Sequence, residues 1–201
     1  LENPIVIDSA GVIISPLGMG VIVGHGEIDD GSFQRPRLVT SGLAAALFVR
    51  SIVFHGVGGF DGDFFILADD GDFCWRVWLN GYKTIYYPDA LAFHRGGSSR
   101  KKEGHFFNFY YSIRNNLTML IKNLSSPLAI ICVPLSVFYY FFRGVLMRYQ
   151  AVYFDALGAA ILWHCKNRRV VSRKRREVQA LRRVTDASLV RTGVLRFISR
   201  D

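Results

Sequence analysis

The sequence predicts an α/β chain, in which an incomplete sheet domain is followed by helices that lie at a membrane. Three observations lead to this prediction. Short apolar runs interrupted by glycine and proline fill the first half of the 201-residue chain, as is typical of strands and turns. A long aromatic stretch of helical character begins after residue 104. An uncharged run of 16 residues, 127–142, then precedes a strongly basic segment.

Charge divides the chain into two unlike halves. Residues 1–93 carry 5 Lys/Arg against 11 Asp/Glu, whereas residues 94–201 carry 20 against 5. The formal net charge of +9 therefore combines an acidic half of −6 with a basic half of +15. Hydrophobic residues make up 50% of the chain, which excludes an intrinsically disordered protein. The three cysteines are far apart, so they indicate neither a disulfide framework nor a zinc site.

The first half predicts short elements separated by loops. The chain begins with Leu1 inside an apolar pattern and without a charged leader, so we expect the downstream part of a longer protein. A helix over 72–80 is expected to end at Gly81, because glycine favours the position after a helix. The other expected elements are strands within 4–23, a long loop at 24–37, a strand and short helix within 39–53, a loop at 56–63, a strand at 64–67, strand-like residues on both sides of Pro88, and a basic loop at 96–102.

The second half predicts a membrane anchor and a basic tail. The apolar run 127–142 is short for a span of about 20 residues, but extension to Met147 restores the length if Arg143 snorkels. A core helix is the alternative, and spanning and in-plane placements both stay open. Residues 166–183 hold nine Lys/Arg and one acid, which favours the anionic leaflet of a membrane over a solvated helix end. We therefore divide the chain into 1–104, the sheet domain, 105–165, the anchor, and 166–201, the cytoplasmic tail.

The candidate site lies within 58–99. The apolar run 64–67 leads into Asp69, Asp70 and Asp72, where the expected helix begins. Neighbouring carboxylates raise one another's pKa, and such clusters are typical of sites that bind metal or move protons. A second expected strand ends at His94, so we expect Asp70 and His94 to face one cleft. Alternatively, the aspartates only cap the helix.

The same stretch resembles a known family of enzymes. The pattern GGFD-x-DFF-x-x-x-DD-x-D-x-x-x-R-x-x-x-x-GY, followed by PDA-x-x-x-H, is similar to the acceptor half of family 2 glycosyltransferases, and rhamnosyltransferase-like members are most similar. IDSAG at 7–11, SGLAAALFVR at 41–50 and YYSIRNNLTMLIKN at 110–123 also resemble the family. The resemblance implies a GT-A-type, Rossmann-like fold. It also implies inverting transfer of a sugar from a nucleotide diphosphate sugar to a glycan or lipid-linked acceptor.

The resemblance also implies roles for individual residues. Asp70 matches the general base, and Asp69, where glutamate is more usual, would help to orient the acceptor. His94 matches a ligand of the divalent cation, Mg²⁺ or Mn²⁺. No metal-binding D-x-D motif of the donor half is found within residues 1–60. The remaining expected acceptor- or donor-binding residues are Asp72, Arg76, Arg95, Ser41 and Gly42.

Two other classes of protein remain as alternatives. A catalytically inactive membrane adaptor, encoded by a truncated gene, would keep the same fold. A basic nucleic-acid-binding protein would explain the pI of 9.7. The basic charge is confined to a tail beside an apolar anchor, and no nucleic-acid motif is present. We therefore expect a membrane partner and no nucleic acid.

Overall fold

The computed structural model describes residues 6–94 and 103–196. In these residues, β1 (Val12–Ile14) pairs antiparallel with β2 (Gly20–Ile22), and β3 (Arg37–Leu38) pairs antiparallel with β4 (Ile85–Tyr86). The mixture of helices and strands agrees with the predicted α/β class. The described residues form only these two small sheets, so the larger GT-A-type sheet is not seen in them.

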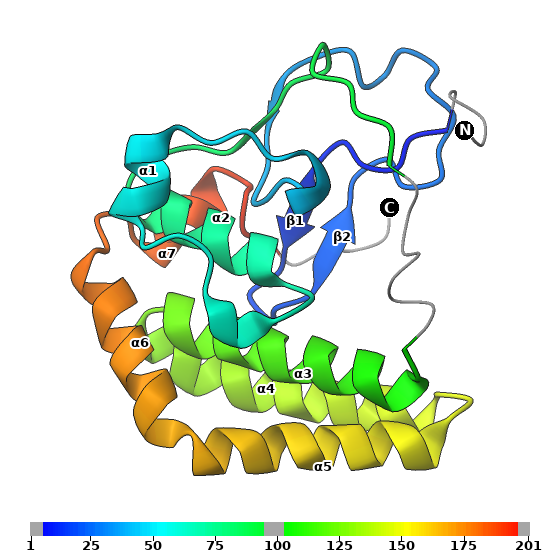
Figure 1. The fold of residues 1–201 in the computed structure, drawn as a ribbon, viewed down its shortest axis with the longest axis vertical. Helices are drawn as coiled ribbons and strands as arrows, with labels where there is room; N and C mark the ends of the chain where they lie inside the picture. Colours follow the sequence, from blue (N-terminus) through cyan, green and yellow to red (C-terminus); the bar gives the residue numbers. More distant parts are fainter. Residues whose placement is uncertain (1–5, 95–102, 197–201) are drawn as a thin grey trace.

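The long helices lie in the second half of the chain. The first half holds the 3-10 turns η1 (Ala44–Ala46) and η2 (Gly62–Phe64) and the helices α1 (Ser51–Gly56) and α2 (Asp69–Leu79). The second half holds α3 (His105–Asn123), α4 (Ser126–Val145), α5 (Gln150–Lys166), α6 (Arg168–Ala180) and α7 (Asp186–Arg191). Figure 1 shows α3, α4 and α5 side by side below the N-terminal half, with α6 rising from the end of α5 back toward it.

The helix expected over 72–80 is confirmed, although it begins earlier. α2 starts at Asp69 and ends at Leu79, Asn80 is its C-cap, and Gly81 follows with φ +89°. The Cβ of any residue at Gly71 would lie 3.1 Å from Cδ1 of Ile14 and 3.4 Å from Sδ of Met119. The glycine therefore lets the first turn of α2 pack closely against β1 and α3.

The strand expected at 64–67 is wrong. Residues 62–64 form the turn η2, and Phe65, Leu67 and Ala68 have positive φ angles of 60–67°. Positive φ interrupts extended backbone, and only Phe64 of the run 64–67 is fully buried. The strand-like residues around Pro88 are likewise reduced to the two residues of β4.

The main hydrophobic core joins the two halves of the chain. α2 contributes Trp75 and Trp78, and α3 contributes Met119 and Leu120. Residues of β1, η2, α4, α6 and the C-terminal segment complete this cluster. A second cluster packs α3 against α4 and α5, and a third packs α1 against α2. α3 is therefore the central element, because it contacts the N-terminal half on one side and the outer helices on the other.

α4 is the one helix of the described residues that is long and apolar enough to cross a membrane. The helix is 20 residues long, and 22% of its most apolar stretch of 18 residues is buried in the protein. The helix expected after residue 104 corresponds to α3, and the one expected at 127–147 corresponds to α4. A third apolar helix, α5, follows after a short turn.

Candidate active site at the start of α2

Asp70 lies in the first turn of α2, between two backbone amides. Its Oδ2 accepts a hydrogen bond of 3.1 Å from the N–H of Ala44, and its Oδ1 accepts one of 2.7 Å from the N–H of Gly71. The side chain is half-buried. Each carboxylate oxygen has two lone pairs, so both oxygens can accept one further proton or hydrogen bond.

The environment makes Asp70 more basic than an ordinary aspartate. Burial raises the pKa of its carboxyl, and the neighbouring charge of Asp69 raises it further. The hydrogen bonds from Ala44 and Gly71 oppose this rise, but the net pKa shift is upward. Asp70 is therefore a carboxylate with a raised affinity for a proton, held in one orientation by backbone N–H groups.

The loop that precedes Asp69 is strained. Positive φ in a non-glycine residue costs on the order of 1–3 kcal/mol, and Phe65, Leu67 and Ala68 all adopt it. The buried side chain of Asn115 on α3 holds this loop in place. Its Nδ2 donates to the carbonyl oxygens of Phe64 at 2.9 Å, Ile66 at 2.6 Å and Leu67 at 2.8 Å. Asn115 is thus the residue that fixes the path of the chain into Asp69 and Asp70.

Arg114, the residue of α3 immediately before Asn115, supports the same loop. Its guanidinium donates to the carbonyl oxygens of Asp63 and Phe64 and to Oδ1 of Asn115. It also lies 4.8 Å from the ring centre of Trp163 on α5. Arg114 therefore connects the loop to the outer helices, and it orients the carboxamide of Asn115 through its contact with Oδ1.

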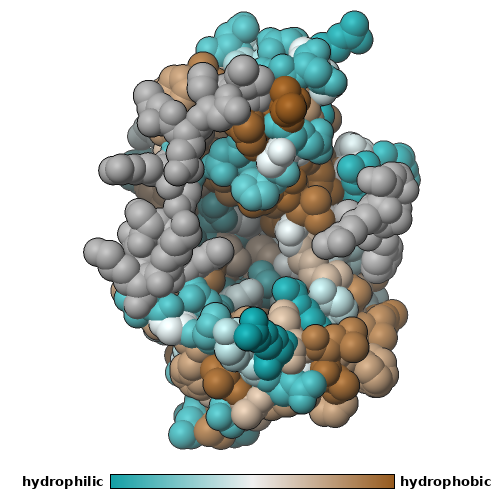
Figure 2. All heavy atoms as spheres, turned by 90° about the vertical axis from the view of Figure 1, so that its right-hand side faces the viewer, coloured by the Kyte–Doolittle hydropathy of each residue, from teal (hydrophilic) through white to brown (hydrophobic). Residues whose placement is uncertain are grey.

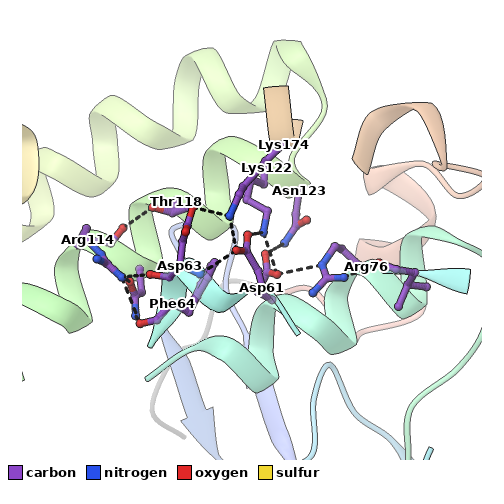
Figure 3. A network of polar contacts seen from close by, with 12 residues as sticks. Asp61, Asp63, Phe64, Arg76, Arg114, Thr118, Lys122, Asn123 and Lys174 are labelled. Atoms are coloured by element: carbon purple, nitrogen blue, oxygen red, sulfur yellow. Dashed lines mark hydrogen bonds and ion pairs between the residues drawn. The ribbon is translucent and has the colours of Figure 1, made fainter. Parts of the chain in front are cut away.

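Arg76, which the sequence places in the binding site, lies in a buried network (Figure 3), and so does Asp72, the other expected binding residue of this helix. Asp72 is fully buried, and its Oδ2 lies 2.9 Å from Nε of Arg76 and 3.0 Å from Nζ of Lys122. Asn123 donates to the other oxygen of Asp72 at 3.1 Å. Arg76 also donates to the carbonyl oxygen of Val57 at 2.5 Å. Asp72 therefore joins α2 to α3 through Lys122 and Asn123, and it offers no exposed oxygen to a ligand.

The network continues into the loop before η2. Nζ of Lys122 lies 2.5 Å from Oδ2 of Asp61, and Lys174 of α6 pairs with both Asp61 and Asp63. Burial alone would raise the pKa of Asp61, but Lys122 and Lys174 outweigh it and lower that pKa to about 2. Ion pairs therefore link α2, α3 and α6 close to the candidate site, and the spacing of these residues in the sequence did not indicate them.

Ser41 and Gly42 lie in the segment that reaches Asp70. Ser41 is buried, pairs with Val12 of β1 through its backbone and donates its hydroxyl to the carbonyl of Gly42. Ala44, two residues further, contributes the N–H that binds Asp70. The structure therefore brings this segment to the start of α2.

His94 has a different partner from the one expected. Its Nδ1 lies 2.9 Å from Oδ2 of Asp8, and His25 lies 3.6 Å from the other oxygen of Asp8. Among the described residues, no hydrogen bond or ion pair joins His94 to Asp69 or Asp70. The described ranges also contain no group of three His, Cys, Asp or Glu side chains able to hold a metal ion. They do not fit a complete Mg²⁺ or Mn²⁺ site. Arg95 lies outside the described residues.

The surface is hollowed on the side toward which α2 begins. Figure 1 shows that α2 runs from the centre of the molecule to the left, so its first turn points to the right. Figure 2 looks onto that right-hand side and shows a hollow between the N-terminal half and the helices below it. The side of the molecule toward which the first turn of α2 points is therefore concave.

The residues that sequence reasoning missed lie mostly on α3. Arg114, Asn115, Thr118, Lys122 and Asn123 are all buried, although each is polar. Arg114, Thr118 and Lys122 follow one another every four residues along one face of an otherwise aromatic and apolar helix, and the two asparagines are adjacent to the ends of this row. That polar stripe was the available signal, because buried polar side chains need partners on the element that covers them.

Comparisons with known proteins leave the function open. No protein-family model matches the chain, and no solved structure matches it significantly. A protein of Sinorhizobium fredii (strain NBRC 101917 / NGR234), described as uncharacterized protein y4gI, is 31% identical over 106 residues. The aligned part covers 48% of this chain and 11% of that protein, so the chain spans about a tenth of the relative's length. A function for this chain therefore has to be argued from its own site.

Proposed function

We propose that the chain is the acceptor-side part of an inverting glycosyltransferase that acts at a membrane, with Asp70 as the general base. The observation that carries the proposal is the setting of Asp70. Its carboxylate is half-buried, is held by two backbone N–H groups and has a raised pKa. A positioned base of raised pKa accepts a proton more readily than a solvated aspartate does. The resemblance of 58–94 to family 2 glycosyltransferases supplies the reaction.

In the proposed step, a hydroxyl group of the acceptor lies against a carboxylate oxygen of Asp70. The hydroxyl oxygen forms a bond to the anomeric carbon of the donor sugar while its proton passes to Asp70. The bond from that carbon to the nucleoside diphosphate breaks on the opposite face, and the diphosphate leaves with the electron pair. The configuration of the anomeric carbon is inverted. Asp70 then releases the proton to water.

The neighbouring groups have separate roles in this proposal. Asp69 keeps Asp70 basic through its charge and offers a second acceptor of hydrogen bonds to a sugar hydroxyl. Asn115 is a positioning residue, because it holds the strained loop that leads into both aspartates. Asp72 and Arg76 support α2 from within the protein. A divalent cation would assist departure of the diphosphate, and the roles of Asp70, Asp69 and Asn115 do not require this chain to bind that cation.

Membrane association belongs to the same proposal. The apolar helix α4 and the basic helix α6 follow the candidate site in the chain. A glycan or lipid-linked acceptor at the membrane would meet Asp70 from that surface. The site would face the cytoplasm, where nucleotide diphosphate sugars are available as donors.

The test is sugar transfer by membranes that contain the chain, with Mg²⁺ or Mn²⁺ supplied. The chain is assayed alone and joined to a nucleotide-binding half. Asp70→Asn keeps the size of the side chain and removes its basicity, so we expect the transfer rate to fall about 10²- to 10⁴-fold. Asp155→Asn, at an exposed aspartate of α5 outside the candidate site, is the matched control and is expected to leave the rate unchanged.

Three results decide the proposal. Full activity in Asp70→Asn would remove Asp70 as the base. A rate that does not fall as the pH drops through the pKa of Asp70 would do the same. No transfer by the wild-type chain in either form would instead favour the inactive membrane adaptor.

A further inference from the structure

α4 carries an apolar face that no other part of the described protein covers. The exposed fractions of Ile130, Phe138 and Leu146 are 74%, 61% and 88%. Successive exposed positions three or four residues apart lie on one side of the helix. Figure 2 shows hydrophobic side chains gathered at its lower right. This part of the surface is at the back of the molecule as drawn in Figure 1, and α4 lies on that side. The residues of this exposed α4 face are Ile130, Ile131, Leu135, Phe138, Phe141, Phe142, Val145 and Leu146.

The opposite face of α4 is attached to the protein along its whole length. Cys132, Ser136, Tyr140 and Gly144 are buried and follow one another every four residues. The hydroxyl of Ser136, in the middle of the helix, donates to the carbonyl oxygen of Leu17 at 2.9 Å. Leu17 lies in the connection between β1 and β2. The midpoint of α4 is therefore bonded to the N-terminal half of the chain.

This attachment is incompatible with α4 crossing a bilayer. A helix of 20 residues is about 30 Å long, so a spanning α4 would place Ser136 near the middle of the hydrocarbon. The loop around Leu17 would then have to enter the hydrocarbon, where loop backbone groups find no partners for their hydrogen bonds. α3 and its buried charged residues would have to follow, because Asn116 of α3 donates to Tyr140 of α4. Only one side of α4 is free to meet lipid.

Exposed basic side chains lie at the C-terminal end of α4 and at the junction of α5 and α6. Arg143 and Arg148 lie near the end of α4, and Lys166, Arg168 and Arg169 lie where α5 passes into α6. All five are exposed, and no carboxylate of the described residues forms an ion pair with any of them. This positive charge complements an anionic surface rather than an uncharged one.

A groove of about 450 Å³ lies at the N-terminal end of α4, between that helix and α6. Ala129, Ile130 and Val133 give it an apolar wall, and Arg175 of α6 lies on its lining. The groove therefore offers an apolar wall to the acyl chains of a phospholipid and a guanidinium group to its phosphate.

The geometry points to in-plane docking: the chain binds an anionic phospholipid bilayer with α4 lying flat in the interface and its exposed face among the acyl chains. The exposed arginines and lysines at the ends of α4 and α6 contact the phosphate groups. This inference rests on the proposed function only for the presence of a membrane. Its tests measure lipid binding and not sugar transfer, so either proposal can fail without the other.

The first test measures binding of the full chain to vesicles of phosphatidylcholine and phosphatidylglycerol mixed roughly three to one. Phe138→Asp removes one large apolar side chain from the exposed α4 face, so we expect binding to fall about tenfold or more. Phe48→Asp is the matched control, because Phe48 is 98% exposed in the N-terminal half, and its binding should be unchanged. Equal losses in both variants, or no binding of the wild-type chain, would overturn the inference.

The charges are tested with the same vesicles. Arg168→Glu is expected to weaken binding at least about fivefold, and Arg35→Glu, at an exposed arginine of the N-terminal half, is expected to have little effect. Pure phosphatidylcholine should bind the wild-type chain more weakly than the mixture does. Equal binding to the two kinds of vesicle would show that anionic headgroups are not recognised.

The second test separates in-plane from spanning placement. Ser126→Cys introduces a thiol at the first residue of α4, and Gln150→Cys introduces one after its end. Both variants also carry Cys165→Ser, which removes the exposed native cysteine. A maleimide that cannot cross membranes is added outside sealed vesicles carrying the protein. We expect both thiols to react, because both ends of an in-plane helix lie on one side. Protection of only one of them would mean that α4 spans the bilayer.

Discussion

The contact between Asn115 and the loop before Asp69 leads to the sharpest prediction. Asn115→Leu keeps the number and branching of the side-chain heavy atoms but removes the carboxamide. The carbonyl oxygen of Phe64 keeps Arg114 and the N–H of Ile66 as donors. The carbonyl oxygens of Ile66 and Leu67 lose the hydrogen bonds of 2.6 Å and 2.8 Å that Asn115 gives them. Two buried or half-buried acceptors are therefore left without this donor.

The expected cost follows from these two acceptors and from Nε of Arg114, which loses Oδ1 of Asn115 as its acceptor. An unsatisfied buried polar group costs about 1–3 kcal/mol, and relaxation of the positive-φ residues recovers part of it, so we expect a net destabilisation of about 3 kcal/mol. In a chain of this size the melting temperature changes by about 2–4 °C per kcal/mol, which gives a decrease of about 6–12 °C. Urea unfolding measures the free energy directly, and hydrogen exchange of residues 64–70 reports whether the loop opens first.

Asn116→Leu is the matched control for this prediction. Within the described part of the chain, the side chain of the neighbouring Asn116 makes one hydrogen bond, 2.9 Å long, to the hydroxyl of Tyr140. Its loss is expected to cost about 1 kcal/mol and to leave exchange of the loop unchanged. The reasoning is refuted if the two variants lose equal stability, or if Asn115→Leu leaves the loop as protected as in the wild type.

Two further predictions concern the buried ion pairs. Lys122→Met leaves Asp61 and Asp72 each without one cation and should destabilise the protein by about 3 kcal/mol, whereas Lys174→Met, at a more exposed lysine, should cost about 1 kcal/mol by urea unfolding; equal losses would contradict the role of Lys122. The pKa of Asp61 is about 2 in the folded protein against an ordinary value of 3.8, so about 2 kcal/mol of stability is present above pH 3.8 and lost as the pH falls toward 2. Asp61→Asn should remove that acid-dependent part of the unfolding free energy, and an unchanged pH profile would disprove it.

Several elements were predictable because their signals are local. The helix that ends before Gly81 and the long helices of the second half depend on apolar periodicity, capping and glycine, all of which act within a few residues. The split between an acidic and a basic half is likewise a property of the sequence. The placement of Asp69 and Asp70 at the beginning of a helix also follows from local sequence.

The strand expected at 64–67 failed because its apolar residues do not determine the backbone there. The partners that bend this segment are Arg114 and Asn115, which lie 48 to 51 residues further along the chain. His94 failed to meet Asp70 for a similar reason, since Asp8, 86 residues earlier, is its partner. Pairings between distant residues leave no periodic pattern in the sequence.

The sequence by itself determined the helices, the charge asymmetry and the position of the carboxylate cluster, because each depends on neighbouring residues. Only the tertiary structure decided which carboxylates serve as support and which stay accessible. Lys122 and Arg76 bury Asp72, whereas backbone N–H groups hold Asp70 at the surface. The tertiary structure also decided that one side of α4 remains free, because Ser136 in its middle is bonded to Leu17. The physical reason is that burial and hydrogen bonding depend on which distant segments pack together.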